Sequence, residues 1–256
     1  MKRIDINSDL GESFGCYTLG MDSEVLQYVS SANIACGFHA GDPLVMERTV
    51  SHAAKLGTAI GAHPGFPDLM GFGRRNMACS PQEIKAYVQY QIGALQAFAS
   101  SHGAKLQHVK PHGALYNLAG RDFNVAMAIA QAVSEIDPGL ILLGLSGSQL
   151  IKAGRQAGLQ TASEVFADRN YRSDGSLVPR VEPDSVIRDH EAAIVRTVQM
   201  VKEGAVKAVT GEVIPICADS ICVHGDNPEA VSFARDIHRA LQGEGIEVVP
   251  LIKLFL

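Results

Sequence analysis

Three charged side chains stand inside apolar stretches of the sequence, where a charge is unusual. Asp9 lies in "RIDINSDL", Lys110 in "LQHVKPHGAL" and Glu164 in "TASEVFA". A buried charge is costly unless an opposite charge or a ligand pairs with it, so these residues require one another or a substrate. Carboxylates can act as general bases, and a lysine can stabilise negative charge that develops during a reaction. We therefore predict Asp9, Lys110 and Glu164 as catalytic residues.

Five further polar residues occur in or just after segments that have the pattern of strands. We predict that they bind substrate: Asn7, His39, His63, His112 and His224. The simpler interpretation of any one of these histidines is a hydrogen-bonded structural group. Neutral imidazoles together with an aspartate can also hold a metal ion, and Asp9, His39 and His63 come from three such segments. No H-E-x-x-H motif or other close ligand pair is present, so the sequence alone leaves the metal open.

The elements that must position these residues follow from the hydrophobic pattern. Short apolar segments alternate with longer segments of helical period, which is typical of βα units and a parallel sheet. Strand character is found in 3–9, 31–37, 57–63, 105–111, 139–145, 159–167, 220–226 and 246–251. Helices are expected near 22–30, 43–56, 81–101, 122–135, 148–157, 184–203 and 228–242. About seven or eight such repeats predict one α/β domain over 1–256, a closed or nearly closed barrel whose strand ends bring the predicted site residues to one mouth.

Local signals mark the helix starts and two irregular segments. A capping residue precedes a proline in Asp42-Pro43, Ser80-Pro81 and Asn227-Pro228. The segment 204–219 alternates like a strand without a following helix, so we expect an inserted hairpin or a long loop. The segment 63–77 is rich in glycine and proline yet apolar, so we expect it to cover the mouth, to contact a partner or to pack on its own barrel.

The composition narrows the classes of function. The chain has 256 residues, a formal net charge of −5 and no dense group of Lys or Arg, which argues against a nucleic-acid partner. Five cysteines without a C-x-x-C pair predict free thiols in a reducing compartment. Because neither an apolar leader nor a membrane-length segment is evident, we expect a cytoplasmic location and no membrane contact. Neither G-x-G-x-x-G nor a P-loop motif occurs, and small molecules and other proteins remain as partners.

Five segments together resemble the LamB/YcsF family over nearly the whole chain: "DINSDLGESFG", "SANIACGFHAGDP", "GAHPGFPDLMGFGRR", "VKPHGALYN" and "FADRNYRSDGSLVPR". The resemblance implies a seven-stranded, TIM-like β/α barrel similar to those of polysaccharide deacetylases and related glycoside hydrolases. It also implies ATP-dependent hydrolysis of 5-oxoproline to glutamate, with ATP and Mg²⁺ as co-substrate, in a complex with the 5-oxoprolinase subunits B and C.

The implied reaction fits the predicted site. Phosphorylating the oxygen of a lactam gives a poor electrophile a phosphate leaving group, which requires cations near phosphate and a carboxylate that activates water. The cation candidates besides Lys110 are Arg74, Arg75, Arg169 and Arg172. Two alternatives stay open: a metal-dependent deacetylase or amidohydrolase that acts without ATP, and a non-catalytic subunit that presents substrate to its partners.

Overall fold

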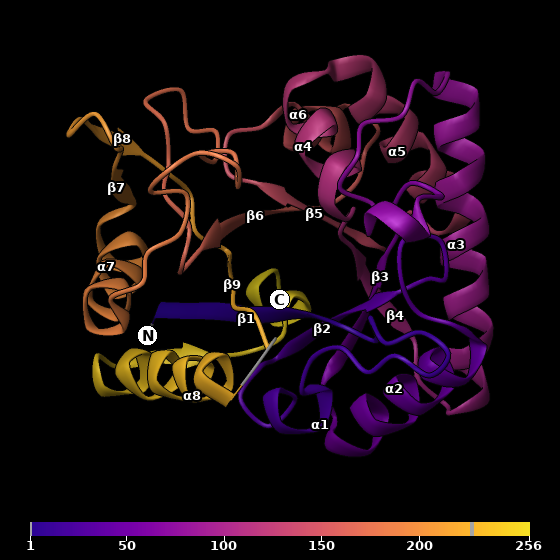
Figure 1. The fold of residues 1–256 in the computed structure, drawn as a ribbon, viewed down its shortest axis with the longest axis horizontal. Helices are drawn as coiled ribbons and strands as arrows, with labels where there is room; N and C mark the ends of the chain where they lie inside the picture. The colour runs from indigo at the N-terminus through magenta and orange to yellow at the C-terminus, as the bar shows by residue number, and fades with distance from the viewer. Residues whose placement is uncertain (1, 226–227) are drawn as a thin grey trace.

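The chain folds into a closed β/α barrel (Figure 1). The structure is a computed structural model and describes residues 2–225 and 228–256. Within those ranges a ring of parallel strands runs in the order β1, β2, β3, β4, β5, β6 and β9, and β9 pairs back to β1. Their bounds are Lys2–Leu10 (β1), Ser31–Ala35 (β2), Ala59–His63 (β3), Leu106–Val109 (β4), Ile141–Leu145 (β5), Thr161–Phe166 (β6) and Ser220–Cys222 (β9). The predicted seven-stranded, TIM-like α/β barrel is confirmed.

Helices enclose the ring on its outer side (Figure 1). They are α1 (Asp22–Val25), α2 (Pro43–Leu56), α3 (Pro81–Ser101), α4 (Gly113–Arg121), α5 (Phe123–Ile136), α6 (Gln149–Gln156), α7 (His190–Glu203) and α8 (Pro228–Gly243), with short 3-10 helices η1 (Leu69–Gly71) and η2 (Leu251–Leu254). Outside the ring lie the hairpin β7 (Ala205–Lys207) and β8 (Val213–Pro215), and β10 (Ile246–Val248), which pairs with the start of β1.

All five cysteines are free thiols, as predicted. In the described part of the chain, none of the helices has both the length and the apolar character needed to cross a bilayer.

Two of the predicted helix caps are confirmed. The Asp42 carboxylate accepts hydrogen bonds at 2.9 Å from two backbone N–H groups in the first turn of α2, with Pro43 at the first helical position. Ser80 and Glu83 form a reciprocal capping box at the start of α3. The third predicted cap, Asn227, lies outside the described residues.

Some elements differ from their prediction. α1 ends at Val25 instead of residue 30, because the chain already joins the sheet at Ser30, whose N–H donates to the Ile6 carbonyl. α7 begins later than predicted, where the Asp189 side chain caps it, and α4 is a helix that the sequence analysis did not predict. The hairpin expected within 204–219 is confirmed as β7 and β8, which lie beside α7 (Figure 1).

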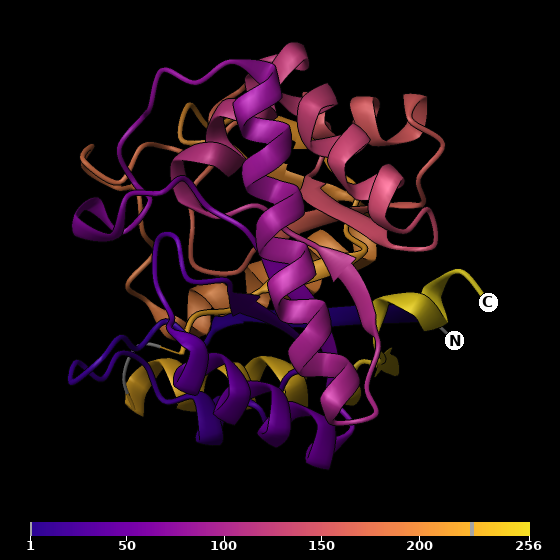
Figure 2. The same ribbon diagram turned by 90° about the vertical axis from the view of Figure 1, so that its right-hand side faces the viewer.

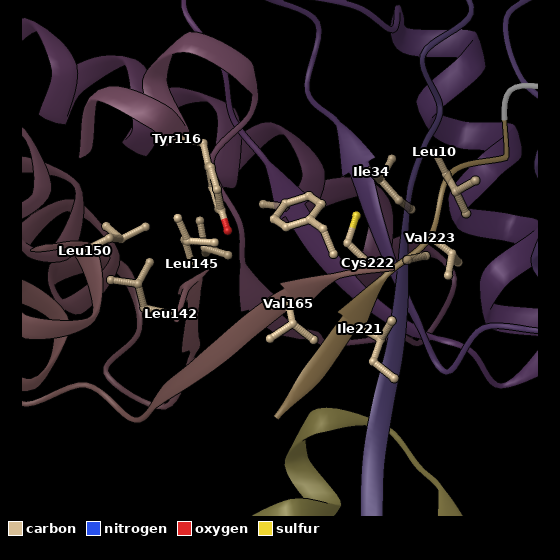
Figure 3. Packing of buried hydrophobic residues seen from close by; sticks show 14 of the residues in the cluster. Leu10, Ile34, Tyr116, Leu142, Leu145, Leu150, Val165, Ile221, Cys222 and Val223 are labelled. Atoms are coloured by element: carbon tan, nitrogen blue, oxygen red, sulfur yellow. The ribbon is translucent and has the colours of Figure 1, made fainter. Parts of the chain in front are cut away.

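Two apolar clusters hold the barrel together. The larger lies mainly between the strands and the helices, and Figure 3 shows part of it around Leu142, Val165 and Ile221 of β5, β6 and β9. The smaller lies where η2 covers the amino ends of β5 and β6. It consists of Ile141, Leu143, Ala162 and Leu251. Figure 2 shows η2 and the start of β1 on the same side of the molecule. Apolar side chains therefore fill the barrel at the amino ends of β5 and β6.

The strand register places polar side chains in layers inside the barrel. Asp9 of β1 is in register with Asn33 of β2, and Gly61 of β3 with His108 of β4. Because side chains alternate along a strand, Asn7 and Asp9 share the inner face of β1. A Cβ atom at Gly61 would lie 2.1 Å from Nε2 of His108, so the glycine leaves the room that this ring occupies.

Candidate active site at the carboxyl ends of the strands

Lys110 is the centre of an ionic cluster at the carboxyl end of the barrel. Its Nζ lies 3.0 Å from Oδ1 of Asp9 and 2.8 Å from Oε1 of Glu164. It also donates hydrogen bonds to Asn7 Oδ1 at 3.1 Å and to Cys222 Sγ at 3.3 Å. Burial alone would lower the pKa of Lys110, but the surrounding Asp9, Cys222 and Glu164 hold that pKa well above its ordinary value. The three predicted catalytic residues therefore meet around one fixed positive charge.

The two carboxylates of this cluster differ in their access to solvent. Glu164 is fully buried, and its Oε2 accepts a hydrogen bond from the Tyr116 hydroxyl at 2.6 Å. The Asp9 side chain keeps 19% of its surface exposed. Burial alone would raise the pKa of Asp9, but His63 and Lys110 hold it well below its usual value. Glu164 is thus the buried partner of Lys110, and Asp9 is the ionised carboxylate that solvent reaches.

Two side-chain amides and a histidine fix the orientation of these groups. Asn33 Nδ2 donates to Asn7 Oδ1 at 2.7 Å and to Asp9 Oδ1 at 2.8 Å. The Asn33 amide oxygen is 2.7 Å from His108 Nε2, which therefore donates to it. Burial, followed by the positive charge of Lys110, lowers the pKa of His108 to about 3. His108 is thus neutral and orients the Asn33 amide.

A second buried carboxylate lies deeper in the barrel. Asp5 accepts hydrogen bonds from the hydroxyls of Ser30 at 2.7 Å and Ser31 at 2.6 Å, and from that of Ser220. Burial raises the pKa of Asp5 to about 6 despite these hydrogen bonds. The three hydroxyls donate hydrogen bonds to the carboxylate oxygens but carry no positive charge that would offset burial. Asp5 therefore gains or loses its proton near pH 6.

Three of the predicted histidines form a buried cluster beside Asp9. His112 Nδ1 lies 2.9 Å from His63 Nε2, and the rings of His39 and His112 are stacked with centroids 3.8 Å apart. Glu12 Oε1 lies 3.7 Å from His39 Nε2 and 3.6 Å from His112 Nδ1. One donor atom from each of Glu12, His39, His63 and His112 lies within 4.8 Å of the others, a spacing that suits a metal ion. Burial, followed by repulsion from neighbouring histidines, holds the pKa of both His39 and His112 well below its ordinary value.

The segment 63–77 packs onto this histidine cluster. The Phe72 carbonyl accepts a hydrogen bond from His112 Nε2 at 2.9 Å. Gly73 has φ +61°, and a Cβ atom there would lie 2.9 Å from Cδ2 of His112, so only glycine allows this close approach. Met70 at the tip is 92% exposed. The segment therefore covers the histidines as part of its own barrel, and contact between its tip and a partner remains a prediction.

His224 forms a separate pair on the β9 side of the mouth. Its Nδ1 lies 2.8 Å from Asp168 Oδ2, and its Nε2 lies 3.1 Å from a guanidinium nitrogen of Arg180. Arginine only donates, so Nε2 accepts and Nδ1–H donates to Asp168. The structure thus brings the other predicted site residues into the Lys110 and histidine clusters and gives His224 its own partners.

The four arginines considered as cation candidates lie in different surroundings. Arg75 and Arg172 form ion pairs near the surface, and Arg169 donates to backbone carbonyls within the segment that follows β6. Arg74 lies over the Phe72 ring, with 4.9 Å between its guanidinium carbon and the ring centroid. Arg74 and Arg75 both belong to the segment that covers the histidine cluster, and Arg75 is paired within it with Asp68.

Sequence reasoning missed the roles of Glu12, Asn33, His108 and Tyr116. A signal existed for His108, because it precedes Lys110 by two residues and therefore shares its face of the strand. No comparable signal existed for Tyr116, which reaches Glu164 from the unpredicted helix α4.

A closed ring of parallel strands with an ionic cluster at its carboxyl ends defines the class: β/α-barrel proteins whose site lies in the barrel mouth. The chain belongs to the LamB/YcsF family, whose model matches residues 4–255. It is 57% identical over 255 residues to the A subunit of 5-oxoprolinase from Clostridium beijerinckii, covering 100% of both chains.

The comparison with solved structures agrees. A lactam utilization protein from Thermus thermophilus is 49% identical, with a TM-score of 0.91 over 96% of this chain and 99% of that one. The T48 deacetylase, whose structure contains its substrate, is 15% identical, with a TM-score of 0.51 over 99% of this chain and 90% of that one. At this low identity, the similarity to the deacetylase shows only that the two proteins share the barrel fold.

Proposed function

We propose that this chain is the A component of an ATP-dependent 5-oxoprolinase, which opens 5-oxoproline to glutamate together with subunits B and C. The names of the relatives support the substrate, since they include 5-oxoprolinase and lactam utilization. The observation that carries a catalytic role is the buried Lys110, held between Asp9 and Glu164 beside three histidines. A fixed cation of this kind is what a lactam oxygen requires when it gains negative charge.

The reaction explains why such a site needs both charges. Opening the ring adds one water molecule across the C–N bond, and hydrolysis of ATP to ADP and phosphate uses a second. Lys110 stabilises the negative charge on the lactam oxygen or on the phosphate attached to it. Asp9 accepts a proton from the attacking water. Asp9 is ionised and partly exposed, which supports this role for it. Glu164 is less suited, because it is fully buried and accepts a hydrogen bond from Tyr116.

ATP with Mg²⁺ is assigned to the assembled complex. The chain carries neither a P-loop nor a dinucleotide-binding sequence. The proposal therefore makes ATP a co-substrate without placing its site on this subunit.

The test is reconstitution. The chain alone, and the chain with subunits B and C, are given 5-oxoproline, ATP and Mg²⁺, and glutamate and ADP are measured together. We expect the three-subunit complex to release glutamate in step with ADP. Absence of glutamate from the complete complex would contradict the proposal.

The donor cluster of Glu12, His39, His63 and His112 favours a second candidate, a metal-dependent amidohydrolase or deacetylase without ATP. A metal ion held there would supply Lewis-acid polarisation of a carbonyl group. Glutamate release by this chain in the absence of ATP, abolished by a chelator, would favour this candidate over the first.

A further inference from the structure

Hydrogen bonds to two backbone carbonyls decide where the protons of His63 and His112 lie. His63 Nδ1 is 2.7 Å from the carbonyl oxygen of Lys110, and His112 Nε2 is 2.9 Å from that of Phe72. A carbonyl oxygen only accepts, so each of these ring nitrogens carries its hydrogen. In the neutral rings, His63 Nε2 and His112 Nδ1 then carry lone pairs.

These two lone pairs face each other across 2.9 Å. Carboxylate oxygens lie close to both, with Asp9 Oδ2 3.3 Å from His63 Nε2 and Glu12 Oε1 3.6 Å from His112 Nδ1. No pair among these electron-rich atoms forms a hydrogen bond while both rings are neutral. They repel one another unless a positive charge lies between them, either a proton on one of the rings or a metal ion.

His39 supplies a third imidazole to the same place. Its side chain is fully buried, and in the described ranges neither ring nitrogen has a hydrogen-bond partner. Its Nε2 lies 3.7 Å from Glu12 Oε1. The backbone of the covering segment closes the other edge of the ring, because a Cβ atom at Gly65 would lie 2.5 Å from His39 Nδ1. A buried polar nitrogen without a partner is costly, and a bond from Nε2 to a cation removes that cost at one of the two ring nitrogens.

We propose that Glu12, His39, His63 and His112 bind a divalent transition-metal ion. Three of the six donor pairs are 2.9, 3.6 and 3.7 Å apart, near the roughly 3.4 Å that separates the ligands of a tetrahedral ion with bonds of about 2.0–2.1 Å, and all six lie within 4.8 Å. Imidazole suits Zn²⁺, Fe²⁺ or Ni²⁺, whereas Mg²⁺ prefers oxygen ligands, so this ion is distinct from the Mg²⁺ of ATP. The proposal rests on this geometry and is independent of the reaction proposed above.

The surroundings of two of the ligands, His63 and His112, fit this assignment. Metal-binding histidines commonly donate their second N–H to a backbone carbonyl or a carboxylate, as His63 and His112 do here. Asp9 lies beside His63 and also pairs with Lys110, so it joins the metal site to the ionic cluster.

The test counts bound metal and measures its affinity. The purified full chain is stripped with a chelator and titrated with Zn²⁺ in competition with a chromophoric chelator, and bound metal is counted by mass spectrometry. We expect about one Zn²⁺ per chain. Glu12→Gln and His112→Gln should each weaken binding at least about a hundredfold, since even outer partners of a metal site contribute about 10- to 100-fold. The matched control is His102→Gln, a surface histidine paired with Glu47, which should bind like the parent.

Two further measurements keep the test decisive. Circular dichroism of the metal-free variants checks folding, and if His112→Gln does not fold, Glu12→Gln carries the comparison because its side chain lies at the partly exposed edge of the site. X-ray absorption of the Zn²⁺-loaded parent should show imidazole ligands. The proposal is overturned if the parent binds no Zn²⁺, if Glu12→Gln binds with parental affinity, or if the absorption spectrum lacks imidazole. Glutamate release is measured separately, so failure of the metal site and failure of the proposed reaction are distinguishable.

Discussion

Lys110 Nζ and Glu164 Oε1 lie 2.8 Å apart in a part of the barrel that solvent does not reach. The same ammonium group is shared with Asp9, so one cation balances two carboxylates. Removing one member of a buried ion pair leaves the other unpaired, which destabilises far more than breaking a surface pair. Lys110 therefore acts on stability as well as on the proposed chemistry, and single substitutions alone do not separate the two roles.

Lys110→Met tests both roles when it is paired with a second substitution. We expect the single variant to lose about 3–5 kcal/mol of unfolding free energy, because Glu164 becomes an unpaired buried charge. Lys110→Met/Glu164→Gln replaces that charge by a neutral amide and should recover much of the loss. In complexes with subunits B and C, both variants should release glutamate about a hundredfold to a thousandfold more slowly. Parental turnover by a stable double variant would refute the catalytic role of Lys110.

Asp9→Asn keeps the size of the side chain and removes its charge. Because Asp9 is the ionised carboxylate that solvent reaches, we expect glutamate release to fall about a hundredfold or more. The matched control is Asp236→Asn, which removes a half-exposed carboxylate on α8 and should leave turnover unchanged. If the Asp9 variant assembles and turns over normally, the chain is better described as a subunit that presents substrate.

Tyr116→Phe removes the hydroxyl that donates to Glu164 at 2.6 Å. A hydrogen bond to a buried carboxylate contributes about 1.5–3 kcal/mol, so urea unfolding should show a loss of that size. Tyr90→Phe removes a hydroxyl from a tyrosine that is 65% exposed and should change the unfolding free energy little. If the two variants have the same unfolding free energy, the hydrogen bond from Tyr116 to Glu164 does not stabilise the fold and the prediction is wrong.

Two glycine substitutions should have opposite effects. In Gly61→Ala the new Cβ would lie 2.1 Å from His108 Nε2, so the ring must move and we expect a loss of about 1–3 kcal/mol. In Gly93→Ala, inside α3, the Cβ enters open space, and the higher helix propensity of alanine should stabilise by up to about 1 kcal/mol. Thermal unfolding of both variants checks the prediction, which fails if their midpoints shift in the same direction.

Asp5 should give the barrel a measurable pH dependence. Its pKa is about 6 in the folded chain against 3.8 for the ordinary group, so the folded state binds more protons between these values. The contribution of Asp5 therefore makes the unfolding free energy fall as pH rises through this window, by up to about 3 kcal/mol. Asp5→Asn does not titrate, so the unfolding free energy of the variant relative to the parent should rise between about pH 4 and pH 7. A difference that stays constant over this range would show that Asp5 does not titrate as expected.

The sequence by itself determined the features that depend on short segments. The caps at Asp42 and Ser80 and the inward alternation of Asn7 and Asp9 were predictable, because capping and strand alternation involve residues only a few positions apart. The meeting of Asp9, Lys110 and Glu164 was also predictable in outline, because parallel strands of a barrel bring their carboxyl ends to one mouth.

Only the tertiary structure decided which partners these groups have. Tyr116 reaches Glu164 from a helix without a local signal, and His224 pairs with Asp168 instead of joining the other histidines. The facing lone pairs of His63 and His112 depend on two backbone carbonyls from different segments. The physical reason is that a side chain's protonation and hydrogen bonds are set by whatever the closed ring and its loops bring within about 3 Å, and that is fixed by strand register and loop path across the whole chain.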